Sequence, residues 1–111
     1  MPRITTHPGS MLHHEFMVPY ELSARAVAKL MDVPANRITS LVNGDRGMTA
    51  DTALRLERVF GMSAEFWMRL QASYDESKAR AEHDYSALKL FEGVNDNLTD
   101  DRAKPRLAPH R

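Results

Sequence analysis

Apolar residues recur at three- and four-residue intervals along most of the chain as far as Tyr74, which is the spacing of one buried face of an α-helix. Strand-like alternation of polar and apolar residues is missing throughout the sequence. Prolines and glycines separate the periodic stretches and predict five helices, over residues 8–18, 24–31, 34–43, 50–60 and from 64 onwards. The pattern therefore predicts an all-α fold of five helices.

Residues suited to helix ends stand at these predicted boundaries. The hydroxyl side chains expected to accept a hydrogen bond from the first turn of a helix are Ser23, Thr49 and Ser63. Pro34 is expected at the first position of the third helix, where its missing N–H costs nothing, and Asn43-Gly44 is expected to close that helix.

The inward face of each helix defines a predicted core. The expected core residues of the first four helices are Leu12, Phe16, Val27, Leu30, Met31, Ile38, Leu41, Val42, Ala53, Leu56, Val59 and Phe60. Trp67, at the start of the fifth helix, is expected in the core or in a dimer interface.

The fifth helix meets no helix-breaking residue before Gly93, so we predict an extended last helix. Its apolar stripe is too irregular for a strong coiled coil, and we expect residues 66–74 to pack on the core and the remainder to form a marginal helix. We accordingly divide the chain into a domain over residues 7–80, a helical extension over 81–92 and a tail over 93–111. The polar composition of the tail predicts disorder.

Residues 24–43 meet the requirements of a helix-turn-helix unit, in which two short helices cross near a right angle through a tight turn. Ala28 is the small residue where the helices touch, and Ile38 and Leu41 anchor the second helix. Asp32 replaces the usual glycine of the turn, and aspartate tolerates the left-handed conformation better than most residues. The unit predicts a DNA-binding module.

The polar face of the helix at 34–43 is expected to lie in the major groove of DNA. Asparagine can pair with adenine and arginine with guanine, and the start of a recognition helix reaches deepest into the groove. We therefore assign Asn36, Arg37 and Ser40 to base contacts. The other expected DNA-binding residues, at phosphates or in secondary contacts, are Arg25, Ala35, Thr39, Asn43, Arg46 and Thr49.

The assignment of the polar helix face to DNA has a plain alternative, and the role of a further residue, Thr52, is also open. The polar residues of the helix at 34–43 would equally suit an ordinary solvated helix face. Thr52, beside Thr49, could contact a phosphate or make a local hydrogen bond at the helix end.

Composition limits how DNA could be bound. The 111 residues contain 15 Lys and Arg against 15 Asp and Glu, so the formal net charge is zero. A broad basic surface is therefore not expected, and DNA binding would depend on a few well-placed side chains in a dimer that recognises two half-sites. The absence of cysteine, of a signal peptide and of a membrane-spanning run leads us to expect a cytoplasmic protein.

Catalytic and metal-binding motifs are incomplete. His14-Glu15 begins the H-E-x-x-H pattern of zinc proteases, but Val18 stands at the position of the second histidine. Glycine-rich phosphate loops do not occur. We expect no enzyme activity, no cofactor and no metal site, and we expect His7, His13 and His14 to be surface or packing residues.

Three signatures occur in order along the chain: His7-Pro8-Gly9, the stretch from Asn43 to Leu56, and the stretch from Glu65 to Asp75. Together they closely resemble the HigA/VapI antitoxin family, which belongs to the lambda-repressor-like helix-turn-helix group. The resemblance covers roughly residues 7–80. It implies a homodimeric repressor that binds operator DNA and silences a HigB-type ribonuclease toxin.

The resemblance leaves two further functions open. The chain could be a stand-alone helix-turn-helix repressor without a toxin partner, or a helical interaction module that has lost DNA binding. Because a palindromic operator needs a dimer, the fifth helix is our candidate for the dimer surface.

Overall fold

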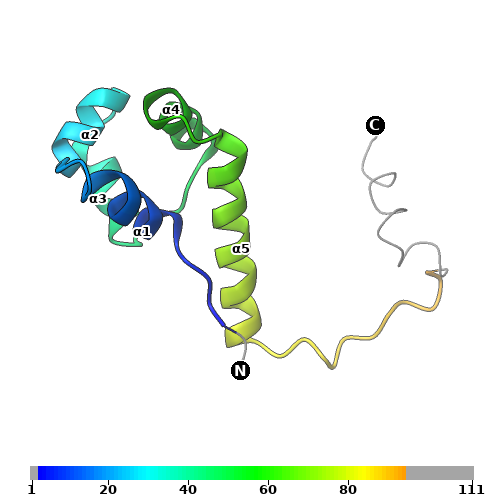
Figure 1. Ribbon diagram of the computed structural model, residues 1–111. Helices are drawn as coiled ribbons and strands as arrows, with labels where there is room; N and C mark the ends of the chain where they lie inside the picture. Colours follow the sequence, from blue (N-terminus) through cyan, green and yellow to red (C-terminus); the bar gives the residue numbers. More distant parts are fainter. Residues whose placement is uncertain (1–2, 95–111) are drawn as a thin grey trace.

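Five α-helices form where the apolar periodicity and the capping residues coincide (Figure 1). The computed structural model describes residues 3–94. Its helices are α1 (Pro8–Leu12), which continues in one π-helical stretch (His13–Met17), α2 (Ala24–Met31), α3 (Ala35–Val42), α4 (Ala50–Phe60) and α5 (Ala64–Glu82). The described residues contain no strand, so the all-α prediction is confirmed.

The predicted N-caps of α2, α4 and α5 are confirmed. Ser23 accepts from the amide of Ala26 at 3.0 Å, and Thr49 accepts from that of Thr52 at 3.3 Å. Ser63 does the same for α5. Each bond satisfies an amide that has no partner within its own helix.

The predicted start of α3 is wrong by one residue. Pro34 is the N-cap and not the first helical residue, because its ψ of 147° is extended. Its carbonyl accepts the first hydrogen bond of the helix, from the amide of Arg37 at 3.0 Å. The extended residue carries the chain from the turn at Asp32 into α3.

The core lies where α1 packs on α3 and α5, α2 packs on α3 and α4, and α4 packs on α5. Its buried apolar residues are Leu12, Met17, Val27, Ala28, Met31, Ile38, Leu41, Met48, Ala53, Leu56 and Trp67. Trp67 is fully buried and packs against Phe16, with ring centroids 5.7 Å apart. Trp67 is therefore a core residue within a single chain.

One expected core residue, Leu30, is exposed, and four others are only partly buried. Leu30 is 56% exposed because Val27, Ala28 and Met31 form the buried stripe of α2, and Leu30 lies roughly 100° around the helix from its centre. The four that are half-buried and pack against the core are Phe16, Val42, Val59 and Phe60.

The helical extension predicted over 81–92 is wrong beyond Glu82. His83 is extended, and the carboxylate of Asp84 then accepts from the amide of Ser86 at 2.9 Å, which favours a local turn over a helix. Leu88 and Phe91 are about three-quarters exposed at 76% and 75%, so no burial offsets the entropy cost of a helix there. Most of the predicted tail, residues 95–111, lies outside the described residues.

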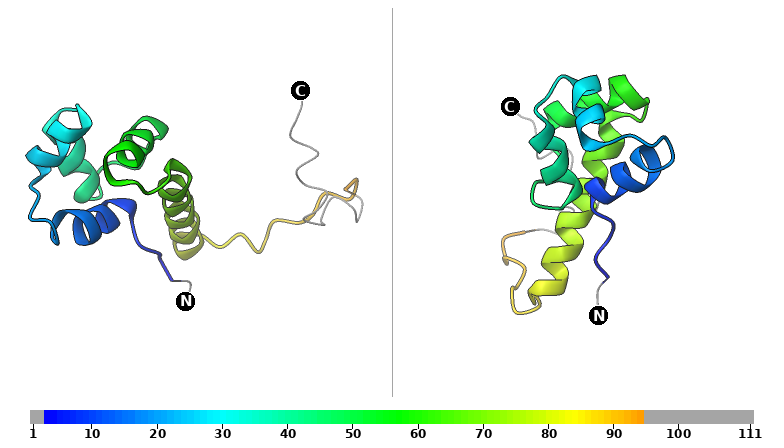
Figure 2. Two further views of the ribbon diagram at one scale, coloured as in Figure 1. Left: turned by 45° about the horizontal axis from the view of Figure 1, so that its top comes forward. Right: turned by 90° about the vertical axis from the view of Figure 1, so that its left-hand side faces the viewer.

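The segment before α1 runs along the second half of α5 (Figure 2). The amide of Thr5 donates to the hydroxyl of Ser77 at 2.9 Å. The His7 ring meets the Tyr74 ring edge-on, with centroids 4.8 Å apart. Residues far apart in sequence therefore fix α5 against the amino-terminal part of the domain.

Candidate DNA-binding interface

The tight turn between α2 and α3 forms as the sequence predicts. Asp32 adopts the left-handed conformation, with φ 58° and ψ 50°, and caps α2. Ala28 is 3% exposed, and its carbonyl accepts from the amide of Val33 at 3.0 Å. Ile38 and Leu41 are fully buried beneath α3. Because Ile38 and Leu41 are buried, the opposite face of α3 points outward.

The predicted DNA-contacting residues of α3 lie on this outward face. Asn36, Thr39 and Asn43 are exposed, and Ala35 and Ser40 are half-buried. The Thr39 hydroxyl donates to the carbonyl of Asn36 at 3.3 Å. Within residues 3–94, the side-chain amides of Asn36 and Asn43 make no hydrogen bond, so their donors and acceptors are available to a ligand.

Arg37 is held differently from its neighbours. Its Nη1 donates to Oδ2 of Asp51 at 2.6 Å, and its side chain is 28% exposed. Asp51 lies in the first turn of α4, where a negative charge also suits the helix dipole. The ion pair therefore joins the start of α3 to the start of α4.

Asp51 is shared by a second arginine. Arg55 donates from Nε to the same Oδ2 at 3.0 Å, and from Nη1 to the carbonyl of Met31 at 2.9 Å, at the end of α2. Hydrogen bonds from Arg37 and then from Arg55 hold the pKa of Asp51 below its usual value. The i, i+4 spacing of Asp51 and Arg55 is visible in the sequence as a helix ion pair. The contact with Arg37 has no local signal, because Arg37 lies 14 residues away in α3.

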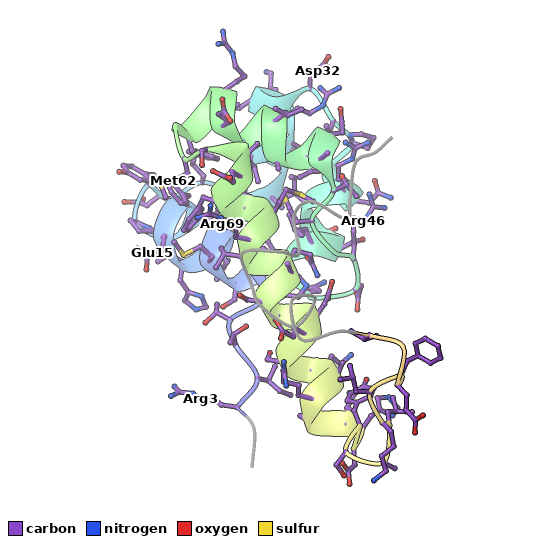
Figure 3. The ribbon with its side chains drawn as sticks, turned by 90° about the vertical axis from the view of Figure 1, so that its right-hand side faces the viewer. Arg3, Glu15, Asp32, Arg46, Met62 and Arg69 are labelled. Carbon is purple, nitrogen blue, oxygen red and sulfur yellow. The ribbon has the colours of Figure 1, made fainter. Side chains whose placement is uncertain are left out.

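The loop between α3 and α4 presents Arg46, which is exposed (Figure 3). In that view Arg46 lies on the opposite side of the molecule from Met62 and Glu15, and Asp32 lies at the top. Gly44 has φ 81°, a conformation that favours glycine and lets the chain turn after α3. Arg46 is thus presented to solvent directly after the C-terminal end of α3.

The same loop is tied down from α5. Oε1 of Gln71 accepts from the amide of Met48 at 2.6 Å, and its Nε2 donates to Asp75 at 2.9 Å. A Cβ at Gly47 would lie 3.1 Å from the Gln71 side chain, so the loop passes close to this glutamine. Helical periodicity gives no signal for such a residue.

The remaining predicted contacts lie at helix starts. Arg25 is exposed in the first turn of α2. The Thr49 hydroxyl caps α4 and also donates to the Thr52 hydroxyl at 3.2 Å. Thr52 is buried, so the local alternative describes its position in this structure.

From residue 3 to residue 94, no three His, Asp or Glu side chains are placed to share a metal ion. None of the helices described is both long and apolar enough to cross a membrane.

Comparison with known proteins places these features in a family. A helix-turn-helix family model matches residues 15–67. Virulence-associated protein I of Dichelobacter nodosus is 46% identical over 91 residues, which cover 82% of this chain and 81% of that protein.

Two solved structures are also similar. An addiction module antidote protein of a HigA family from Coxiella burnetii is 44% identical, with a TM-score of 0.67 over 69% of this chain and 84% of that one. Pseudomonas aeruginosa antitoxin HigA with the higBA promoter is 35% identical, with a TM-score of 0.72 over 86% of this chain and 100% of that one. The chain therefore belongs to the HigA/VapI-type helix-turn-helix family of DNA-binding proteins.

Proposed function

We propose that this protein is an antitoxin that represses its own operon by placing α3 in the major groove of a palindromic operator. The observation that carries the proposal is the outward face of α3, where the amides of Asn36 and Asn43 have no partner among the described residues. The similarity to an antitoxin solved with its promoter supports DNA binding by a domain of this fold.

The contacts divide by chemistry. Asn36, Arg37 and Ser40 carry the donors and acceptors that distinguish base pairs in the major groove. Ala35 offers an apolar surface suited to a thymine methyl group. The residues proposed for phosphate or secondary contacts are Arg25, Thr39, Asn43, Arg46 and Thr49.

The neutral charge makes a dimer necessary for useful affinity. With a formal net charge of zero, a single domain gains little from counterion release, whereas a dimer doubles the contacts over two half-sites about 34 Å apart. We propose that α5 provides the homodimer surface, because its second half extends beyond the core.

The proposed partner is a HigB-type ribonuclease toxin encoded beside this gene, which the antitoxin binds and silences. This part rests on family membership. The alternative is a stand-alone repressor with the same α3 interface and no toxin partner.

Two experiments test the proposal. A mobility shift on the promoter of the protein's own gene should show binding, and Asn36→Ala and Arg37→Ala should each weaken it by about 1–3 kcal/mol with relaxed specificity. An unchanged shift in both variants contradicts the α3 assignment. Co-expression with the neighbouring gene should yield a copurifying complex, whereas promoter binding without a complex supports the stand-alone repressor.

A further inference from the structure

We propose that Asp51, on α4, determines base specificity by orienting the guanidinium of Arg37 toward a guanine. The inference rests on the proposed binding of DNA by α3 and adds a residue outside the helix-turn-helix unit to the recognition of bases. Asp51 would act through Arg37, as a positioning residue.

The geometry fixes Asp51 from both sides. Oδ2 of Asp51 accepts from Nη1 of Arg37 at 2.6 Å and from Nε of Arg55 at 3.0 Å. Arg55 is anchored in turn by the backbone carbonyls of Met31 and Asp32, at 2.9 and 3.3 Å. The carboxylate is therefore placed relative to the end of α2, the start of α3 and the start of α4 together.

The ion pair leaves the DNA-reading part of Arg37 available. The bond to Asp51 uses Nη1, and a guanidinium carries five N–H donors in a planar fork. The edge formed by Nε and Nη2 retains two parallel donors, which match O6 and N7 of guanine. The carboxylate of Asp51, bound to Nη1, therefore fixes the direction in which the edge of Nε and Nη2 points.

Fixing the side chain before DNA arrives has a physical benefit. A free arginine loses much rotamer freedom when it is immobilised against a base. Arg37 is already held in one arrangement, with 28% of its side chain exposed, so less freedom remains to be lost on binding. The smaller entropy loss favours only the base that the oriented guanidinium fits, so it increases specificity.

The negative charge of Asp51 need not repel DNA, because two arginines compensate it. Arg37, Arg55 and Asp51 together carry one net positive charge, so the carboxylate is compensated within the network. Removing the carboxylate should, on charge alone, strengthen binding to every sequence. A loss of base preference without a loss of general affinity would therefore come from orientation.

The experiment measures dissociation constants by fluorescence anisotropy. The probes are a duplex from the promoter of the protein's own gene, a set with each base pair changed singly, and an unrelated duplex. The proteins are the wild type, Asp51→Asn, Arg37→Ala, the double variant and Asp45→Asn. Asp45 is the matched control, because it is an exposed carboxylate in the loop after α3 and makes no ion pair within residues 3–94.

We expect one guanine position at which Arg37→Ala removes the preference. Asp51→Asn should reduce the preference at that same position by roughly three- to tenfold, with affinity for the unrelated duplex equal or higher. In the Arg37→Ala background, Asp51→Asn should leave the base preference unchanged. Asp45→Asn should keep the wild-type preference throughout.

These ratios do not depend on the fraction of folded protein, because an inactive fraction cancels between two duplexes. If the wild type binds its promoter and Asp51→Asn keeps the full preference for guanine, the inference is overturned while the proposed function stands. If the wild type does not distinguish its promoter from the unrelated duplex, the proposed function itself fails.

Discussion

The backbone amide of Met48 donates a 2.6 Å hydrogen bond to Oε1 of Gln71, across 23 residues of sequence. Met48 is 4% exposed, so its amide has little access to water if the glutamine is removed. Gln71→Ala should therefore lower the free energy of unfolding by about 1–3 kcal/mol, the cost of leaving a buried donor unpaired. Urea unfolding followed by the fluorescence of Trp67, the chain's single tryptophan, measures this.

The same substitution should weaken DNA binding. The loop that Gln71 ties down carries Arg46, so loss of the bond should lower affinity for all sequences by similar factors. Ser73→Ala is the control, because Ser73 lies on the exposed side of α5. If Gln71→Ala and Ser73→Ala unfold with the same free energy, the hydrogen bond between Met48 and Gln71 does not contribute to stability.

Gly9 is required by packing and not by its backbone angles. A Cβ at this position would collide with the backbone carbonyl of Leu41, where α1 crosses the end of α3. Glycine to alanine within a helix is ordinarily favourable by about 0.5–1 kcal/mol. Gly9→Ala should instead destabilise the protein by about 1–3 kcal/mol, because α1 must move away from α3.

Thermal unfolding of Gly9→Ala and of Ser10→Ala provides the comparison. Ser10 is half-buried in the same helix, and its hydroxyl lies 3.2 Å from Nδ1 of His14, one turn further along the chain. A Gly9→Ala protein as stable as the wild type would mean that the crossing can relax without cost.

Local chemistry explains which parts of the fold could be predicted from the sequence. The caps Ser23, Thr49 and Ser63 act within one turn, so their effect is visible in a short stretch of sequence. Gly9 illustrates the opposite case, since its contact at Leu41 is set by how two distant helices cross. The prediction for the end of α5 was wrong because it relied on helix-breaking residues, and the first of these is Gly93. The helix ends at Glu82 instead, where side-chain burial no longer stabilises it.

The same distinction between local and long-range contacts applies to the candidate DNA-binding site. The outward face of α3 follows from helical periodicity, so Asn36 and Thr39 could be placed from sequence. The ion pair between Arg37 and Asp51 spans 14 residues and depends on how α4 meets α3. Gln71 and Asp51 therefore required the three-dimensional structure.

The apolar residues after α5 should contribute little to stability. Leu88, Leu90 and Phe91 are 76%, 65% and 75% exposed, so a triple change to serine removes almost no buried area. The free energy of unfolding should change by less than about 0.5 kcal/mol, as for ordinary surface substitutions. Urea unfolding at two protein concentrations checks this, and a large loss of stability would indicate that these residues are buried in an assembly.

His7 should make the stability of the domain depend on pH. Its Nδ1 accepts from the amide of Gly9 at 2.9 Å and caps α1, which a protonated ring could not do. Burial lowers the pKa of His7 below its ordinary value of 6.5, opposed in part by the negative charge of Asp75. Since the unfolded chain then binds a proton more readily, the contribution of His7 is present above pH 6.5 and is lost as pH falls through the lowered pKa.

His7→Asn isolates this effect. Asparagine is a good N-cap and does not titrate, while the other histidines and Asp75 remain in both proteins. Urea unfolding between about pH 5 and pH 7.5 should show the wild type losing stability toward the acid end more steeply than His7→Asn, over a range in which carboxylates stay charged. Identical slopes for the two proteins would mean that protonation of His7 does not disturb the start of α1.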